Sequence, residues 1–404
     1  MKVLFVHNNF PAQFGPVARA LARDPDTQLA AIGSLSSRPV KGVKLIRYRM
    51  PAGDVAPTHP FARRFDLECR RAEQVLYGLS SLVAGGFTPD VIMAHPGWGE
   101  TLPLKSVFPK ARLLLYCEFF YGGDGRDVGF DLEFPITGLD GDVGLRLKNA
   151  TTLLGLSDCD RALSPTEWQR STFPSHFHGK IDVIHEGVDT YLVKPDPDAV
   201  FDLGSGRRLT RADQVITFVA RNLEPMRGYH VFMRALPRIL AKLPAAQVLI
   251  VGGDDTSYGA RPPRGKTWKS IFLAEVADRI DLARVHFTGR LPHQRFIRAL
   301  QVSSAHVYLT YPFVLSWSAV EALSCGCVFV GSDTSPVREV VDGDNGILVP
   351  FFDTGQLADR VIEAVRHPRR FNDMRARARQ LVLDRFDAER LCVPKTLELV
   401  RGLR

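Results

Sequence analysis

The sequence predicts an α/β fold made of two doubly wound domains that face a central cleft. Three observations indicate this fold. The chain has 404 residues, which is too long for one compact core. Short apolar runs alternate with amphipathic stretches of helical spacing, as in parallel sheets whose strands are joined by helices. The alternation then restarts after a segment rich in Pro, Asp and Gly at 195–206, which we expect to be the interdomain linker.

The first half opens with the apolar run KVLFVH at 2–7, a polar loop, Gly15 and a predicted helix over 16–24. A strand, a glycine-bearing loop and a helix typically begin a doubly wound domain. No GxGxxG follows the first strand, so the fingerprint of dinucleotide binding is absent. Further strands are expected at 29–34, 90–95, 111–117, from 160 and at 181–184.

The second half repeats the pattern, with an amphipathic helix over YHVFMRALPRILAKL. Its strands are expected at 215–220, 247–251, 285–288, from 307, from 328 and at the GILVPF segment. We expect an N-terminal domain over 1–195 and a C-terminal domain over 196–378. A helical segment over 379–404 is expected to cross back to the N-terminal domain.

Composition narrows the class of protein. Hydrophobic residues make up 45% and charged residues 24%, as in ordinary globular enzymes. The net charge of +8 and the pI near 9.2 favour an anionic partner such as a nucleotide or an anionic membrane face. No nucleic-acid-binding motif occurs, and the six cysteines lack zinc-site spacing. Without a signal peptide or an 18-residue apolar run, a cytoplasmic location with free thiols is expected.

Two basic stretches stand out in the first half. The stretch 38–49 carries Arg38, Lys41, Lys44, Arg47 and Arg49 with no acid among them. The stretch 61–71 adds Arg63, Arg64, Arg70 and Arg71. Together they could form a face for an anionic lipid or acceptor, which would allow peripheral contact with the membrane. A solvated surface is the alternative.

Polar and aromatic residues follow two predicted strands of the first half. The strand at 90–95 ends at His95, with Trp98 and Glu100 just beyond, and Glu118 follows the strand at 111–117. Ligands of parallel α/β sheets bind at the carboxyl ends of strands, so these residues are well placed for an acceptor site. A hydrogen-bonded structural role for His95 and a structural salt bridge for Glu118 remain open.

The stretch VYLTYPFVLSWSAVEALSCGC at 307–327 contains a strand, a loop and a helix carrying Glu321. Ser316 suits a helix N-cap, and a helix N-terminus offers N–H groups to an anion. Phosphates on these amides and ribose hydroxyls on Glu321 would make a nucleotide site. A core helix with a solvated Glu321 is the other interpretation.

Two arginines, Arg221 and Arg227, flank the junction that follows the strand at 215–220. Both could point into one anion site, because a guanidinium binds phosphate in a bidentate manner. No Asp-x-Asp occurs at a strand end, so we expect no metal and no cofactor, and the cations would neutralise a departing diphosphate.

With these pieces together, the second half resembles the retaining glycosyltransferases of family 4, which have the GT-B fold. The matching segments are Arg221 with Arg227-Gly228, Gly252-Gly253, the FTG at 287–289, EALSCG from Glu321 and SDTSPVREVVDGDNGILVPFFD. The N-terminal segments HNNFPAQFGPVARAL, HPGWGE and YCEFFY resemble a bacterial subgroup of that family.

The resemblance implies a role for each candidate residue. Arg221 and Arg227 would neutralise the donor diphosphate, Glu321 would bind the ribose, and His95 would lie near the transferred sugar. Trp98 and Glu118 would lie on the acceptor side. The other implied donor contacts are Gly15, Gly253, Arg290, Leu291, Ser316, Trp317 and Ser318.

Four positions depart from the family pattern. Phe313 stands where the family commonly has a Glu that touches the donor sugar, and Val314 and Ser316 replace glycines. Arg227 replaces the usual Lys, which keeps the charge but changes the geometry. The donor sugar and its base are therefore left open.

The expected function is metal-independent, retaining transfer of a sugar from a nucleotide-diphosphate sugar to an acceptor hydroxyl. The acceptor would attack on the face that the diphosphate leaves, with the diphosphate helping to take its proton. A non-catalytic partner subunit that lost the sugar contact at Phe313 and a sugar-nucleotide epimerase are the two alternatives.

Overall fold

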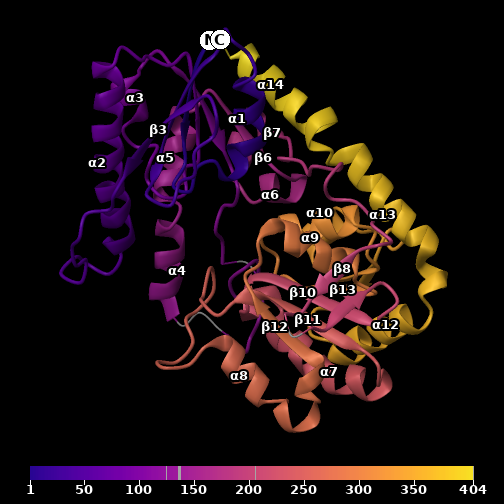
Figure 1. The fold of residues 1–404 in the computed structure, drawn as a ribbon. Coiled ribbons are helices and arrows are strands. Elements are labelled where there is room, and N and C mark those ends of the chain that lie inside the picture. The colour runs from indigo at the N-terminus through magenta and orange to yellow at the C-terminus, as the bar shows by residue number, and fades with distance from the viewer. Residues whose placement is uncertain (124, 135–137, 205, 404) are drawn as a thin grey trace. The chain divides into compact units, whose positions relative to one another are not determined.

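The computed structural model describes residues 1–123, 125–134, 138–204 and 206–403, which form two compact units (Figure 1). Unit 1 comprises residues 1–129, 135–187 and 388–404, and unit 2 comprises 130–134 and 188–387. Each unit contains a parallel sheet with helices on both faces, which confirms the α/β prediction.

The units divide at Gly187–Val188, whereas the sequence pattern places the boundary at 195–196. The predicted linker is instead part of unit 2, where β8 (Val200–Asp202) and β9 (Arg208–Thr210) pair as an antiparallel hairpin. Phe201 and Leu209 of this hairpin are buried, so two apolar side chains give this Pro- and Gly-rich segment a packed position. Ser205 of the predicted linker and Arg404 lie outside the described residues.

Unit 1 is built on a seven-stranded sheet with the order β3-β2-β1-β4-β5-β6-β7. Its strands are β1 (Lys2–Val6), β2 (Gln28–Ser34), β3 (Val43–Tyr48), β4 (Val91–Ala94), β5 (Arg112–Tyr116), β6 (Arg161–Ser164) and β7 (Ile181–Val183). The order reverses between β1 and β4, and ligands of such sheets bind at the carboxyl ends beside this switch point.

The central strands of unit 1, such as β1 and β4, are buried on both faces, as expected for a parallel sheet covered by helices. In β1, Leu4 and Val6 pack toward one core cluster and Val3 and Phe5 toward the other. The helical segments are η1 (Ala12–Phe14), α1 (Gly15–Leu21), α2 (Arg63–Ala84), α3 (Leu104–Val107), α4 (Gly138–Leu147), α5 (Ala150–Asp158), α6 (Glu167–Ser171), η2 (Ser175–Lys180), η7 (Ala388–Cys392) and α14 (Val393–Gly402).

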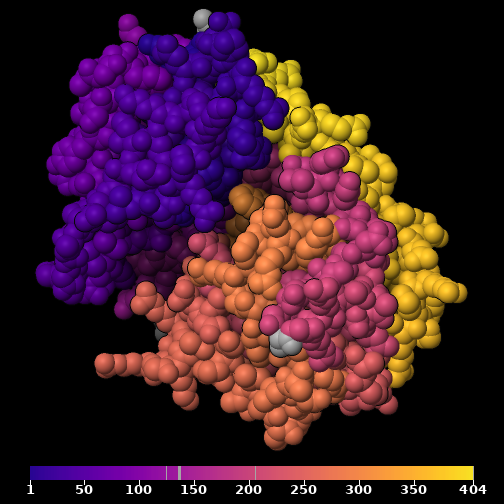
Figure 2. Space-filling model, viewed as in Figure 1, coloured from indigo at the N-terminus to yellow at the C-terminus, as the bar shows by residue number. Residues whose placement is uncertain are grey.

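The C-terminal helix α14 completes one face of this sheet. Val393 and Val400 belong to the core cluster that also contains residues of α1 and the side chains of Val3 and Phe5 in β1. In the space-filling view the C-terminal residues, drawn in yellow, lie at the surface (Figure 2). Residues 388–404 are thus a late part of the sequence that completes the core of unit 1.

Strand β3 was missed by the sequence pattern, which marks 38–49 only as basic. Lys44 and Arg47 interrupt its apolar residues, and all but Tyr48 of its side chains are at least partly exposed. It is nevertheless paired in parallel with β2, from Leu29 opposite Val43 to Ser34 opposite Tyr48. Charged side chains such as Lys44 are typical of an edge strand, where they discourage pairing with another chain.

Unit 2 is built on a six-stranded sheet with the order β12-β11-β10-β13-β14-β15. Its strands are β10 (Val215–Asn222), β11 (Gln247–Gly253), β12 (Val285–Gly289), β13 (Ala305–Tyr308), β14 (Phe329–Ser332) and β15 (Ile347–Val349). The order reverses between β10 and β13, which places the switch point of this sheet beside the ends of those two strands.

Helices cover both faces of this second sheet. On one face α7 (Tyr229–Lys242) packs against α12 (Thr354–Arg366), and Phe232 of α7 stacks on Phe218 of β10 at 4.8 Å. The opposite face is covered by α9 (His293–Gln301), α10 (Trp317–Ser324) and α13 (Asn372–Arg385). The shorter helical segments are η3 (Pro225–Arg227), α8 (Trp268–Ala274), η4 (Ala277–Arg279), η5 (Leu282–Arg284), α11 (Ser335–Arg338) and η6 (Pro368–Phe371).

Two global features bear on the class of protein. Among the described residues, no helix combines the length and hydropathy needed to cross a bilayer. Five of the six cysteines are buried, so their thiols act as small apolar side chains in the fold.

Candidate active site

The phosphate-binding candidate Arg227 lies at the switch point of unit 2, where η3 follows β10. Its Nη1 donates to Thr310 Oγ1 at 2.9 Å and to the carbonyl of Val314 at 3.0 Å. The Tyr308 hydroxyl lies 3.5 Å from the same nitrogen. The side chain is only 7% exposed, so the chain after β13 holds this cation in a fixed position.

Gly228 allows the sharp turn that places Arg227. Its φ is +69°, in the left-handed region, and it is the N-cap of α7. A Cβ at this position would lie 2.3 Å from the Cβ of Leu309. Glycine is thus required both for the backbone conformation and for the approach of the β13–α10 loop.

Aromatic rings enclose the guanidinium of Arg227. Its central carbon lies 5.7 Å from the ring centre of Tyr258 and 5.5 Å from that of Phe313, within cation–π range. Phe313 is 2% exposed and packs on Tyr258 at 5.0 Å. Phe313, at the position where the resemblance predicts a Glu, is therefore a packing partner of Arg227.

Glu224 orders the loop that carries Tyr258, a role that the sequence did not suggest. Its Oε2 accepts three backbone N–H groups, from Ser257 at 3.1 Å, Tyr258 at 3.2 Å and Gly259 at 3.4 Å. The Glu224 side chain is fully buried. A carboxylate bound by successive amides is well stabilised, and Glu224 thereby places Tyr258 beside Arg227.

The second candidate cation, Arg221, is exposed at the end of β10. Its neighbour Asn222 accepts a hydrogen bond from Arg290 Nη2 at 2.8 Å. A Cβ on Gly253 would lie 2.8 Å from Arg290 Nε, so Gly253 makes room for that arginine. The structure thus brings Arg290 and Gly253 together at the ends of β10, β11 and β12. Their common neighbour Asn222 directly follows Arg221 in the sequence.

The start of α10 shows how its amides are used. Ser316 is the N-cap, and its Oγ accepts the N–H of Ser318 at 3.1 Å. The N–H of Ser316 itself donates to the Tyr308 hydroxyl at 2.9 Å, while Trp317 is 46% exposed. A phosphate would therefore compete with two protein hydroxyls for two of the three candidate amides.

Glu321 forms a pair with His293 that the sequence did not reveal. Its Oε1 lies 2.6 Å from His293 Nε2. His293 begins α9, so the pair joins α9 to α10. The hydrogen bond to Glu321 raises the pKa of His293. The adjacent Leu291 packs against the buried cluster that includes Phe201 and Leu209, so its side chain supports the fold beside this pair.

In unit 1, His95 and His7 meet at the switch point between β4 and β1. Their ring centres lie 5.3 Å apart, and Trp98 stacks on His95 at 4.3 Å. Nδ1 of His95 accepts the N–H of Gly97 at 3.0 Å, and Nδ1 of His7 accepts that of Asn9 at 2.9 Å. In the neutral rings the proton is then on Nε2.

Glu118 lies beside these rings at the end of β5. Its Oε2 is 3.5 Å from His95 Nε2, and its Oε1 accepts Gln13 Nε2 at 3.0 Å. Burial lowers the pKa of His7 well below its usual value, so this ring is neutral. Gln13 and His7 are members of this cluster that the sequence did not single out.

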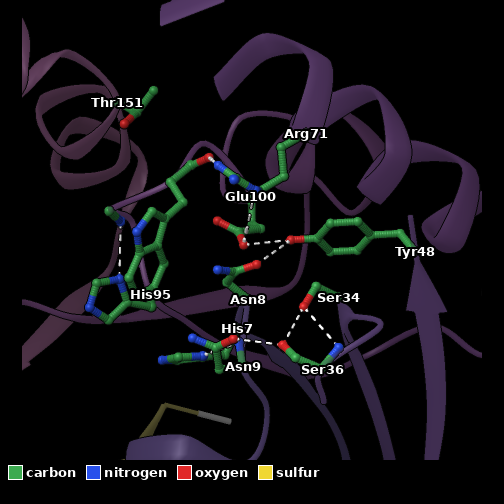
Figure 3. A network of polar contacts seen from close by, with 12 residues as sticks. His7, Asn8, Asn9, Ser34, Ser36, Tyr48, Arg71, His95, Glu100 and Thr151 are labelled. Atoms are coloured by element: carbon green, nitrogen blue, oxygen red, sulfur yellow. Dashed lines mark hydrogen bonds and ion pairs between the residues drawn. The ribbon is translucent and has the colours of Figure 1, made fainter. Parts of the chain in front are cut away.

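Glu100 lies beside Tyr48 and Arg71, as Figure 3 shows. It is fully buried and accepts the Tyr48 hydroxyl at 2.8 Å, with Arg71 Nε at 3.9 Å. Burial raises the pKa of Glu100. Arg71 also donates to the Trp98 carbonyl at 2.6 Å. Glu100 was expected near the ligand, but Tyr48 of β3 and Arg71 of α2 cover it. It instead supports the Trp98 turn through Arg71, which binds the Trp98 carbonyl.

Gly15 is buried at the first position of α1. A Cβ there would lie 3.2 Å from Nη1 of Arg19, an exposed residue one turn along the helix. A glycine at this position therefore leaves space beside a cation. The sequence did not mark Arg19, because a single arginine on a surface helix is unremarkable by pattern alone.

Three of the four arginines in the second basic stretch lie close to carboxylates. Arg64 pairs with Glu68 and Arg70 with Asp66, both at 2.8 Å, and Arg71 lies near Glu100. Arg63 donates to the carbonyls of Thr58 and Ala56. The charges of Arg64, Arg70 and Arg71 are thus paired within the α2 region, whereas Arg63 and the stretch 38–49 remain exposed and basic.

One group in the described part of unit 2 has metal-ligand chemistry, formed by Asp131, Glu133 and His230. Their nearest ligand atoms all lie within 4.8 Å of one another. Arg234, however, binds both oxygens of Glu133, at 2.7 Å and 2.8 Å. The group is therefore organised as an ion-pair network around an arginine.

Solved structures identify the class of this fold. A sucrose-phosphate synthase from Thermosynechococcus elongatus superposes with a TM-score of 0.76 at 16% identity, covering 100% of this chain and 99% of that one. The Anabaena protein HepE, in complex with UDP and glucose, gives 0.68 at 13% identity, with 100% and 99% coverage. The fold is that of the GT-B glycosyltransferases, which confirms the predicted architecture.

Comparisons of sequence are more specific. Residues 25–193 match the model of the Glycosyl transferase family 4 group, and residues 213–367 match Glycosyl transferases group 1. The two matched segments, one in each half of the chain, are thus of glycosyltransferase type, consistent with the expected family 4 type. The narrower bacterial subgroup stays a prediction.

One curated relative is the D-inositol 3-phosphate glycosyltransferase of Mycolicibacterium smegmatis, 28% identical over 220 residues. That match covers 52% of this chain and 46% of the relative. The corresponding protein of Mycobacterium bovis is 29% identical over 196 residues, which are 46% of this chain and 36% of the relative. The matches therefore span less than half the length of these relatives.

Proposed function

We propose that this protein transfers a sugar from a nucleotide-diphosphate sugar to an acceptor hydroxyl with retention of configuration. The observation that carries the proposal is the buried Arg227 held at the switch point of unit 2 by Thr310 and Val314. A fixed guanidinium at that point suits a departing diphosphate, since it needs no reorganisation as charge develops. The UDP-bound HepE structure, similar in fold, supports a nucleotide donor.

The proposed roles follow the site's geometry. Arg227 and the exposed Arg221 would neutralise the diphosphate, and Glu321 would accept the ribose hydroxyls in place of His293. Arg290 with Gly253 would border the base. In unit 1, the Nε2–H of His95 would donate to a sugar oxygen, and Trp98 and Glu118 would contact the acceptor.

We propose that the reaction proceeds without a metal or cofactor, because two arginines supply the positive charge. The acceptor hydroxyl attacks on the face that the diphosphate leaves. The C–O bond to the diphosphate breaks, the new glycosidic bond forms, and the diphosphate oxygen takes the acceptor proton. No nucleophilic side chain of the protein is required.

The test is a panel of sugar nucleotides with glycan and polyol acceptors, scored by release of nucleoside diphosphate. Arg227→Ala and Arg221→Ala should each lose diphosphate affinity, whereas Arg369→Ala, an exposed arginine of η6, should not. Chelator should leave release unchanged. Unchanged diphosphate binding in both active-site variants would refute the roles given to these arginines.

Phe313 favours a second candidate function, a non-catalytic partner subunit. Its buried ring occupies the position of the family's sugar-binding Glu, so the donor sugar lacks that contact. This candidate predicts nucleotide binding without turnover, and a gain of activity when a second transferase is added. Turnover by the purified protein alone decides in favour of the enzyme.

We also propose a cytoplasmic protein whose 38–49 stretch contacts an anionic membrane face. Arg38, Lys41 and Lys44 are exposed beside or on the edge strand β3. Lysines on an edge strand also prevent edge-to-edge association, and a binding test separates the two roles. Vesicles with anionic lipid should retain the protein at low salt, and reversing Lys41 and Lys44 to Glu should abolish retention.

A further inference from the structure

A short acidic and aromatic segment of the chain, Phe130–Phe134, belongs to unit 2 although the residues before it belong to unit 1. We propose that this segment positions Arg227 for the diphosphate. The inference rests on the function proposed above, and adds residues outside the donor site that would control its phosphate affinity.

Aromatic side chains anchor both ends of the segment. The Phe130 ring lies 5.2 Å from that of Tyr311, 5.3 Å from Phe351 and 5.2 Å from Phe352. At the other end the Phe134 ring lies 5.2 Å from Trp268 and 5.5 Å from His230. Aromatic pairs of this kind add stabilising energy beyond that of the area they bury. The segment therefore has a defined binding position on unit 2.

Two carboxylates between these anchors have specific partners. Asp131 Oδ2 accepts the Tyr311 hydroxyl at 2.6 Å and lies 3.0 Å from His230 Nε2. Both Glu133 oxygens are bound by Arg234, which also pairs with Glu275 at 2.8 Å. Asp131 is 4% exposed and Tyr311 5%, so the Asp131–Tyr311 bond is shielded from water and geometrically well defined.

Tyr311 connects the segment to the phosphate-binding arginine. It follows Thr310, whose hydroxyl accepts Arg227 Nη1 at 2.9 Å. Its own backbone N–H donates to the carbonyl of Met226 at 3.0 Å, the residue before Arg227. The side chain of Tyr311 is thus fixed by Asp131 while its backbone lies between the two elements that orient the guanidinium.

This arrangement makes Asp131 and Tyr311 positioning residues, since neither is proposed to touch the nucleotide. Without the Asp131–Tyr311 bond, the Thr310 hydroxyl and the Met226 carbonyl are held less rigidly. Arg227 then samples orientations that do not face a phosphate. The expected loss is selective for ligands that use Arg227, and leaves the rest of the nucleotide site unchanged.

The experiment uses the full chain and measures affinity for UDP, ADP and GDP and for the corresponding monophosphates by titration calorimetry. Tyr311→Phe keeps the ring and removes only the hydroxyl, and Asp131→Asn removes the charge. Each should weaken the preferred diphosphate at least about fivefold with a smaller effect on its monophosphate. Leu132→Ala, in the same segment but 85% exposed, is the matched control and should bind as the unmodified protein does.

A double-mutant cycle separates positioning from general loss of structure. In an Arg227→Ala background, Tyr311→Phe should cause no further loss of diphosphate affinity. An equal loss in both backgrounds, or wild-type affinity in Tyr311→Phe and Asp131→Asn, overturns the inference while the proposed function stands. Wild-type diphosphate affinity in Arg227→Ala alone instead overturns the function proposed for Arg227, and the inference with it.

Discussion

His293 and Glu321 form a charge pair at a position where a nucleotide ribose is proposed to bind. Glu321 is 13% exposed and His293 60%, so the carboxylate is anchored and the imidazole reaches solvent. The raised pKa of His293 means that the charged pair contributes stability below the ordinary imidazole pKa. That contribution is lost as pH rises through the higher pKa of the folded state.

Glu321→Gln should return the pKa of His293 toward its ordinary value, because the principal cause of the raised pKa is the hydrogen bond to this carboxylate. An NMR titration of the His293 ring resonances measures the change. His176 of η2, which is in unit 1, serves as the internal control. A His293 pKa that is the same in both proteins would show that Glu321 does not set it.

Tyr48 supplies the hydroxyl that solvates the buried Glu100 carboxylate. Burial and Glu100 raise the pKa of Tyr48, so it remains a protonated donor. Tyr48→Phe should lower the free energy of unfolding by about 1–3 kcal/mol, the usual cost of leaving a buried polar group unsatisfied. Urea denaturation checks this result.

Tyr77→Phe is the control for the Tyr48 experiment, because Tyr77 donates to Glu73 on the exposed surface of α2. Its substitution should change the free energy of unfolding by less than about 0.5 kcal/mol. Equal effects of the two substitutions would mean that the Glu100 network does not stabilise unit 1.

For single residues, the sequence predicted which polar residues follow the strands better than it predicted their side-chain partners. His95 and Glu118 follow β4 and β5 as expected, because a polar residue after an apolar run marks a strand's carboxyl end. Glu100 follows the same pattern, yet it is buried beneath α2 and β3. Phe313 and His293 acquire their partners from elements distant in sequence, and such pairings have no local signal.

Among the elements, the turn from η3 to α7 depends on a glycine for two separate reasons. Gly228→Ala should destabilise unit 2 by ~1–2 kcal/mol for the left-handed backbone and by about 1–3 kcal/mol more for the contact with Leu309. Gly265→Ala is the matched control, because Gly265 also has a positive φ but has no atom within 4 Å of an added Cβ. Denaturation of the two variants separates the costs, and equal values would exclude a contribution from Leu309.

Three of the elements that the sequence missed have a weak apolar pattern. Strand β3 carries exposed cations along the edge of its sheet, and the hairpin β8–β9 has only three residues in each strand. Helix α4 buries only Leu145 and contains three glycines, so it lacks the periodic apolar stripe of a predictable helix. Central strands and α7 were predictable because burial on both faces of a strand produces a continuous apolar run, and burial of one helix face produces a helical apolar period.

For the whole molecule, nucleotide binding should appear as added stability, since the ligand binds only the folded state. At a concentration of one hundred times Kd the gain is about 2.7 kcal/mol. This corresponds to a rise in Tm of ~5–10 °C for a domain of this size. A thermal-shift screen of nucleoside diphosphates measures it, and Arg227→Ala should remove most of the rise. A rise that persists in that variant would place the nucleotide elsewhere.

The two-domain α/β organisation could be predicted because the strand–helix alternation occurs twice along the chain. The exact membership of each unit could not. Residues 130–134 belong to unit 2 and residues 388–404 to unit 1, and both assignments depend on contacts between parts of the chain far apart in sequence. The order of strands and helices along the chain was therefore enough to predict two α/β domains. The assignment of these two short segments to their units could be made only from the structure.

The histidines at the ends of β1, β4 and β7 share a feature that limits how this sequence can vary. His7, His95 and His185 each accept, at Nδ1, the backbone N–H of the residue two places later. A backbone donor is supplied by every amino acid except proline. In a saturation library at Asn9, proline is the one substitution that necessarily releases the ring of His7, whereas other residues keep its proton on Nε2. The main chain thus determines the tautomers of these three rings. Substitution of the neighbouring side chains leaves the tautomers unchanged, because the backbone N–H donor remains.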